Sequence, residues 1–183
     1  MRRAPIVRTL ALLAVLGLTV AAASSDQGLL HLRATLTGFE ESPPKLTAAS
    51  GTFQAVVSDD ALTYTLTYSG LASVRQAHIH FGQKGVNGGI FIWLCGSALN
   101  LGPPGTPTCP EGAGTVSRTV TAADVVTPIP DQGDIPRLIN GIPTFDAVPR
   151  ILRSGDAYVN VHTARFLAGE IRGQVSLNGL SGA

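Results

Sequence analysis

The stretch from residue 157 to residue 175 alternates apolar and polar residues with a period of two. In residues 157–163, alanine and valine alternate with tyrosine, asparagine and histidine, and residues 170–175 alternate in the same way. Successive side chains of a strand point to opposite faces, so each run predicts a strand with one apolar and one polar face. The short turn between them predicts an antiparallel hairpin. The rest of the chain must supply a core that covers its apolar face.

Similar short runs, separated by glycine, proline and aspartate, fill most of the chain before this hairpin. They predict six more strands, at residues 27–36, 51–58, 61–69, 74–81, 90–95 and 114–120, and a short helix at 145–153. Eight short strands joined by turns predict an all-β sandwich or flattened barrel. The alternation predicts a core that contains Leu32, Leu66, Ala77, Ile79, Val159, Val161, Ile171 and Val175.

Residues 1–23 have the pattern of a secretory signal peptide. Arg2 and Arg3 begin it, an apolar run follows from Leu10 to Val20, and three alanines precede the expected cleavage after Ala23. The apolar run is short for a bilayer span. We therefore expect an exported protein, secreted or periplasmic, whose mature part is one domain at residues 24–183.

The formal charge argues against two classes of partner. It is +1 for the whole chain and becomes −2 when Arg2, Arg3 and Arg8 leave with the signal. Binding to nucleic acid or to an anionic membrane needs a basic surface, so neither is expected. No other apolar run is long enough to span a membrane. We expect a monomer whose partner is an extracytoplasmic protein or ligand.

The chain has two cysteines, Cys95 and Cys109. In an exported protein two cysteines allow one internal disulfide. The loop between them is rich in glycine and proline and predicts no regular structure. Closing a loop of this length stabilises the fold by about 3 kcal/mol in the chain-entropy model. We predict a structural disulfide.

Three histidines are candidates for a metal site. His78 and His80 are two apart on one predicted strand and share a face, and His162 lies on the polar face of another. If the two strands are close, three imidazoles converge outside the core. Imidazole suits zinc and copper, and a three-histidine site leaves one coordination position open. The alternative is that the rings only donate hydrogen bonds to backbone carbonyls or to Glu170.

Three more polar residues accompany the histidines on the predicted hairpin. Asn160, Glu170 and Arg172 lie on its polar face. Glu170 and Arg172 could form an ion pair or reach separate partners, and Glu170 could instead orient the ring of His162. The sequence has no GxSxG motif and no argued nucleophile, so no catalytic residue is assigned and no enzymatic activity is expected. Trp93 is expected to fill space in the core or an interface.

Several segments resemble the CHRD domain, the module named after chordin. They include LTGFEESPP at residues 36–44, AHIHFGQKGVNGGI at 77–90 and GDAYVNVHTARFLAGEIRGQV at 155–175. They occur in the order typical of that family and span most of the predicted mature chain. The resemblance implies an extracytoplasmic β-sandwich and a non-enzymatic binding or structural module of the cell exterior.

A second similarity is to copper/zinc superoxide dismutase. That family also carries an HxH pair on one strand and a later histidine on another, outside a Greek-key barrel, and His78, His80 and His162 match in kind and order. The strand pattern and the resemblances together predict an antiparallel Greek-key sandwich, immunoglobulin-like or dismutase-like. The histidine-rich zinc loop of the dismutases is missing here, and His31 is the one remaining candidate for a fourth ligand. Dismutase activity is therefore not expected, whereas a copper or zinc site is the alternative function.

Overall fold

Antiparallel strands form where the alternating pattern predicts them. The computed structural model describes residues 28–133, 138–139, 142–143 and 145–178. The predicted signal peptide lies outside these residues. Ten of the fourteen elements have the following bounds: β1 Leu30–Thr37, β2 Ser50–Val57, β3 Ala61–Ser69, β4 Val74–Phe81, β5 Gly89–Cys95, β6 Gly114–Thr121, α1 Ala147–Ser154, β9 Ala157–Thr163, β10 Ile171–Gln174 and β11 Ser176–Leu177. The others are the 3-10 turns η1 Gly38–Glu40 and η2 Ala122–Asp124 and the two-residue strands β7 Leu138–Ile139 and β8 Ile142–Pro143.

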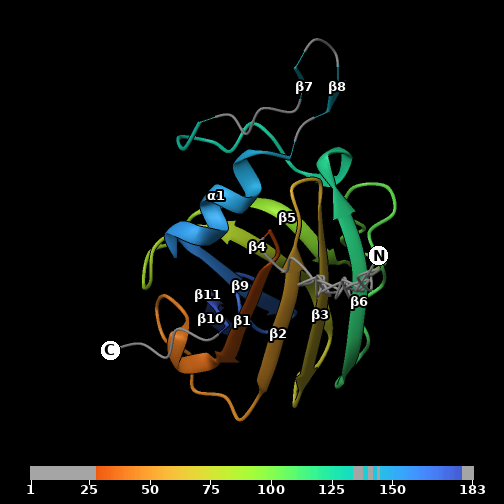
Figure 1. The fold of residues 1–183 in the computed structure, drawn as a ribbon. Coiled ribbons are helices and arrows are strands. Elements are labelled where there is room, and N and C mark those ends of the chain that lie inside the picture. The colour runs from red at the N-terminus through yellow and green to blue at the C-terminus, as the bar shows by residue number, and fades with distance from the viewer. Residues whose placement is uncertain (1–27, 134–137, 140–141, 144, 179–183) are drawn as a thin grey trace, which may run out of the picture.

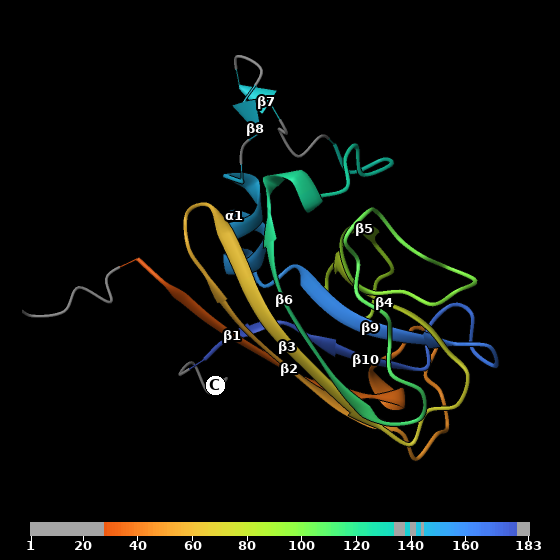
Figure 2. The same cartoon turned by 90° about the vertical axis from the view of Figure 1, so that its right-hand side faces the viewer.

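The long strands share one sheet in the order β5-β4-β9-β10-β1-β2-β3-β6, and β11 also pairs with β1. The sheet curls until its two ends approach, so it is nearly closed (Figure 1). One wall consists of β1, β2, β3 and β6, and the facing wall contains β4, β5 and β9 (Figure 2). A backbone hydrogen bond of 2.8 Å from Val126 to Phe91, beyond the end of β6, joins the two edges. The predicted all-β antiparallel fold with one short helix is confirmed at this level.

The core lies between the two walls. All eight residues predicted to fill it are buried, with exposed fractions of 0–2%. Tyr64 and Tyr68 of β3 are also inside, and their hydroxyls donate to the carbonyls of Leu94 and Pro110. The helix α1 covers one end of the sheet with Val148 and Leu152. Gly155 ends this helix in the left-handed conformation that glycine adopts without strain.

The outer faces of the two walls differ. On β3 the outward residues Thr63, Thr65 and Thr67 are exposed and bond hydroxyls of β6 at 2.9–3.0 Å. By contrast, every residue of β9 is buried, including those of its polar face. The sequence placed that polar face outside the core, which is correct, but segments of chain lie over it. Within the described ranges, no helix is both long and apolar enough to cross a bilayer.

Candidate metal centre

Three loops cover the outer face of β9 and make it a second buried region. Residues 82–88 join β4 to β5, residues 164–170 join β9 to β10, and residues 38–49 join β1 to β2. Two hydrogen bonds tie the first loop to the third, from Ser42 to the carbonyl of Gly85 at 2.9 Å and from Asn87 to the carbonyl of Ser42 at 3.3 Å. Polar side chains that alternation alone would leave in water are therefore enclosed.

The three predicted histidines meet beneath these loops. β4 and β9 are direct neighbours, with Gln76 opposite His162 and His78 opposite Asn160. The exposed fractions of His78, His80 and His162 are 0%, 7% and 6%. One ring nitrogen of each residue can be chosen so that all three lie within 4.8 Å of one another. The sequence-based expectation that His162 approaches the HxH pair is thus matched by the geometry.

Two of the rings are oriented by backbone carbonyls. Nδ1 of His80 lies 2.9 Å from the carbonyl oxygen of Gly88, and Nδ1 of His162 lies 2.9 Å from that of Leu167. A carbonyl only accepts, so both Nδ1 atoms carry the proton and both Nε2 atoms of the neutral rings have a bare lone pair. Histidines that hold metals are fixed in this way, by a hydrogen bond from the second ring nitrogen.

With His78 included, the cluster contains more nitrogen lone pairs than hydrogen-bond donors to satisfy them. Nδ1 of His78 lies 3.2 Å from Nε2 of His162 and can donate to it. The Nε2 atoms of His78 and of His80 are buried and have no hydrogen-bond partner among the described residues. A buried acceptor without a partner costs about 1–3 kcal/mol. A cation among these nitrogens would satisfy them.

Asn160 adds an oxygen to the same cluster. Its Oδ1 lies 3.0 Å from Nε2 of His162, and both atoms are acceptors when Nδ1 of His162 holds the proton. Exchange of the amide oxygen and nitrogen would turn this contact into a hydrogen bond. A bound cation would relieve it equally well, with Oδ1 beside the ion. Asn160 is therefore the fourth polar group at the centre.

The environment keeps all three imidazoles uncharged near neutral pH. Burial lowers the pKa of His80 to about 4, although the Gly88 carbonyl acts in the opposite direction. Burial, reinforced by repulsion from the other two rings, holds the pKa of His78 well below its usual value, and burial lowers that of His162. Only the neutral form of imidazole binds a metal, so the rings are ready to do so without losing a proton to solvent.

Arg172 secures the loop that covers His80. Its guanidinium donates to the carbonyls of Gln83 and Val86, both at 2.9 Å, and its carbon lies 3.3 Å from the centroid of the Tyr158 ring. The Tyr158 ring is also stacked on His80, with ring centroids 4.6 Å apart and planes at 3°. Arginine, tyrosine and histidine thus form one stack. Arg172 is 1% exposed, which means that it belongs to the buried region and not to the surface.

Two buried carboxylates lie in the same region. Glu170 accepts from Thr47 at 2.8 Å and from Thr163 at 2.6 Å. The sequence left open an ion pair with Arg172 or a bond to the ring of His162, and in the structure Glu170 and Arg172 have separate partners and Leu167 orients the ring. Glu41 is 5% exposed. Burial raises the pKa of Glu41 to about 7, while Arg172 and Asn160 partly offset the effect.

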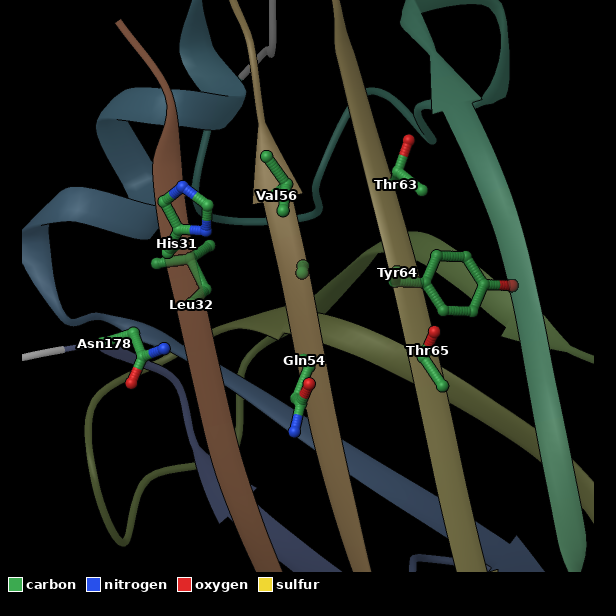
Figure 3. Close-up of a pocket in the computed structure, with 9 residues that line it drawn as sticks. His31, Leu32, Gln54, Val56, Thr63, Tyr64, Thr65 and Asn178 are labelled. Atoms are coloured by element: carbon green, nitrogen blue, oxygen red, sulfur yellow. The ribbon is translucent and has the colours of Figure 1, made fainter. Parts of the chain in front are cut away.

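His31, the fourth histidine of the chain, lies elsewhere. It is on the outer face of β1, at a hollow of about 210 Å³ that is also lined by Gln54, Val56 and Thr63 (Figure 3). This hollow is on the wall opposite β4 and β9. His31 therefore cannot serve as the fourth ligand that the dismutase similarity suggested. The predicted disulfide is present, because Cys95 and Cys109 are bonded.

Three contributors to the centre were not identified from the sequence. Glu41 lies in the irregular segment after β1, and Tyr158 appeared only as one of several polar-face residues. Trp93 was expected to be a space filler, but its ring meets that of His78 at 85° with centroids 4.3 Å apart. The shared polar face gave a signal for Tyr158, whereas the pairing of Trp93 with His78 depends on the register of β4 and β5.

Comparison with known proteins adds one family. A family model, the CHRD domain, matches residues 32–175, which is most of the chain. The match begins in β1 and ends just after β10, so it contains the three histidines and the loops over them. Searches of curated proteins and of solved structures found no match.

Proposed function

The chain belongs to the CHRD-domain family, and we propose that it is an extracytoplasmic module that holds one copper or zinc ion between His78, His80 and His162. The observation that carries this proposal is the pair of buried Nε2 atoms, on His78 and His80, that lack a hydrogen-bond partner among the described residues. A purely structural cluster would satisfy these atoms. An ion would satisfy Nε2 of His80, would accept the lone pair of His162 and would take one ring nitrogen of His78 as its third ligand.

The donor set fits these ions. Imidazole nitrogen suits zinc and copper, whereas calcium and magnesium prefer oxygen ligands. His80 and His162 would bind through Nε2, since their Nδ1 atoms donate to carbonyls. His78 would bind through whichever nitrogen is unprotonated, and Oδ1 of Asn160 would lie beside the ion. A bound ion would supply either structural cross-linking or, for copper, one-electron chemistry.

The burial of the site favours a non-enzymatic module. None of the three rings is more than 7% exposed, and three loops cover them. A substrate of ordinary size would reach the ion only if a loop opened. The disulfide is compatible with an oxidising compartment, which agrees with export directed by residues 1–23.

Metal content tests the proposal. Protein recovered after export is stripped with a chelator, incubated with Zn²⁺ or Cu²⁺, desalted and analysed for bound metal by mass spectrometry. We expect one ion per chain for the wild type and for the control His31→Gln, and a large loss for His80→Gln and His162→Gln. Thermal unfolding verifies that the variants fold. A folded wild type that retains no more metal than His80→Gln would leave only a structural role for the cluster.

A further inference from the structure

We propose that the ion at the three-histidine centre is copper and that Trp93 carries single electrons between it and a one-electron donor or acceptor at the protein surface. This inference rests on the proposed function and makes it more specific. It starts from the contacts of two aromatic side chains, Trp93 and Tyr158, each of which touches a different histidine of the centre.

Trp93 links the buried centre to the outside. It is opposite His78 in the register of β4 and β5, and the two rings meet edge to face with centroids 4.3 Å apart. His78 is completely buried, whereas Trp93 is partly exposed. Gly102, in the loop closed by the disulfide, packs so closely on the indole that a Cβ at this position would clash with it. The indole is therefore held against His78 from one side while part of it reaches solvent.

Tyr158 is a poorer route for an electron. It is 2% exposed, and the guanidinium carbon of Arg172 lies 3.3 Å from its ring centroid. A cation at this distance opposes the removal of an electron from the ring. Trp93 has no such cation among the contacts that the structure describes, and so it is the favoured route.

The charges around the centre favour an ion that can become monovalent. The three imidazoles are neutral donors, and among the described residues no carboxylate or thiolate joins them in the cluster of candidate ligands. A buried net charge is unfavourable, so a centre without an anionic ligand stabilises Cu(I) relative to Cu(II). Zinc has no redox chemistry and would make no use of the indole. With copper bound, the indole of Trp93 would pass one electron from the reduced ion to an outer-sphere acceptor, which gains it, and no covalent bond would form or break and no proton would move.

Trp93 is the single tryptophan of the chain, so its fluorescence reports on the centre directly. In a titration of the metal-free protein, stoichiometric Cu²⁺ should quench the emission several-fold, while Zn²⁺ should leave most of it. His31→Gln should behave like the wild type, and His80→Gln should not be quenched at the same copper concentration. Quenching that is equally strong in His80→Gln would mean that copper binds elsewhere, which would overturn the inference.

The rate of electron exchange tests the role of Trp93 itself. Protein loaded with Cu(I) is mixed rapidly with ferricyanide, an outer-sphere one-electron acceptor, and the appearance of Cu(II) is followed by its absorbance. Trp93→Phe should keep one copper per chain and an unchanged reduction potential, but its oxidation should slow roughly ten-fold, because a benzene ring is smaller than an indole and transmits an electron less well between His78 and the surface. Tyr68→Phe, a change at an aromatic residue of β3, is the control.

The outcomes separate the two proposals. Copper-loaded Trp93→Phe that is oxidised as fast as the wild type would overturn the role of Trp93. A wild type that retains zinc but not copper would also overturn this inference and keep the proposed function. A wild type that retains neither ion would overturn both.

Discussion

Nδ1 of His78 lies 3.2 Å from Nε2 of His162, although the two residues are 84 positions apart in the chain. The contact exists because β4 and β9 are neighbours in the sheet and both turn these side chains away from the core. It places two imidazoles in hydrogen-bond contact in a buried region of the protein. Like this contact, the other polar residues on the outer face of β9 are buried.

The core prediction is tested at Val159. Its side chain is fully buried, so Val159→Asp places a carboxylate among apolar groups without a partner. We expect a loss of at least about 3 kcal/mol in the free energy of unfolding, or failure to fold. Thr65→Asp, at an exposed position of β3, is the control and should change stability by less than about 1 kcal/mol. A Val159→Asp protein that melts like the wild type would mean that the faces of β9 are assigned the wrong way round.

The disulfide should stabilise the fold, but the protein should still fold when the bond is absent. Cys95 and Cys109 close a loop that separates them by 14 positions, and the chain-entropy model gives about 3 kcal/mol for such a loop. Replacing both cysteines by alanine should lower the free energy of unfolding by about this amount in denaturant titrations. The wild type in reductant is the matched comparison and should lose a similar amount. Equal stability of reduced and oxidised protein would contradict the prediction.

Glu41 should make the free energy of unfolding fall as the pH rises, whereas most carboxylates make it rise. Burial raises its pKa to about 7 from an ordinary value near 4.5, so the folded state holds the proton more tightly than the unfolded state. The favourable contribution is complete below pH 4.5 and is lost as the pH rises through 7. Glu41→Gln mimics the protonated form. Its stability relative to the wild type should therefore increase by about 2–3 kcal/mol between pH 4.5 and pH 8.

Comparing the stability of Glu41→Gln with that of the wild type separates the effect of Glu41 from that of the three histidines. The lowered pKa values of the three rings have the opposite effect, because their contribution is lost as the pH falls below about 6.5, but they act equally in both proteins. Glu40→Gln, whose carboxylate makes an exposed ion pair with Lys84 at 3.3 Å, is the control. A stability difference between Glu41→Gln and wild type that does not change with pH would contradict the prediction.

Arg172 should determine the stability of loop 82–88. Arg172→Met keeps most of the side-chain volume but leaves the carbonyls of Gln83 and Val86 without their charged donor. Hydrogen exchange should then quicken at the amide of Gly88, which donates to the hydroxyl of Tyr158. The amides of β1 to β3 should keep their relative protection. Arg33→Gln, on the exposed face of β1, is the control.

Unchanged exchange at Gly88 in Arg172→Met would show that the loop is held by its own backbone contacts. Such contacts exist, since Val86 donates to Gln83 at 3.1 Å and Gly82 to Asp156 at 2.8 Å. The experiment thus shows whether loop 82–88 is held mainly by the buried guanidinium of Arg172 or by these two backbone hydrogen bonds.

The sequence predicts the strands well because alternation depends only on local geometry. The predicted bounds of residues 61–69 and 74–81 coincide with β3 and β4, and the predicted helix at 145–153 is displaced by one or two residues from α1. Alternation also indicates that His78, His80 and His162 point away from the core. Each of these inferences needs only the residues of one strand.

What the sequence could not give is the arrangement between strands and loops. Whether a polar face is exposed depends on what lies over it, and the loops that cover β9 come from three separate parts of the chain. The contact of Trp93 with His78 requires the pairing of β4 with β5, where the register shifts between Ala77 and His78. The high pKa of Glu41 arises from burial in an irregular segment that has no periodic pattern.

The most direct test of the metal centre is a crystal structure of the protein loaded with copper or zinc, with anomalous diffraction measured at the absorption edge of that ion. We predict one anomalous peak under loop 82–88, bonded to Nε2 of His80, Nε2 of His162 and a ring nitrogen of His78, at about 2.0–2.1 Å from each for zinc. The Nδ1 atoms of His80 and His162 should still donate to Gly88 and Leu167. A loaded crystal with an ion at His31 or on the surface, and none between these three rings, would contradict the proposed metal centre.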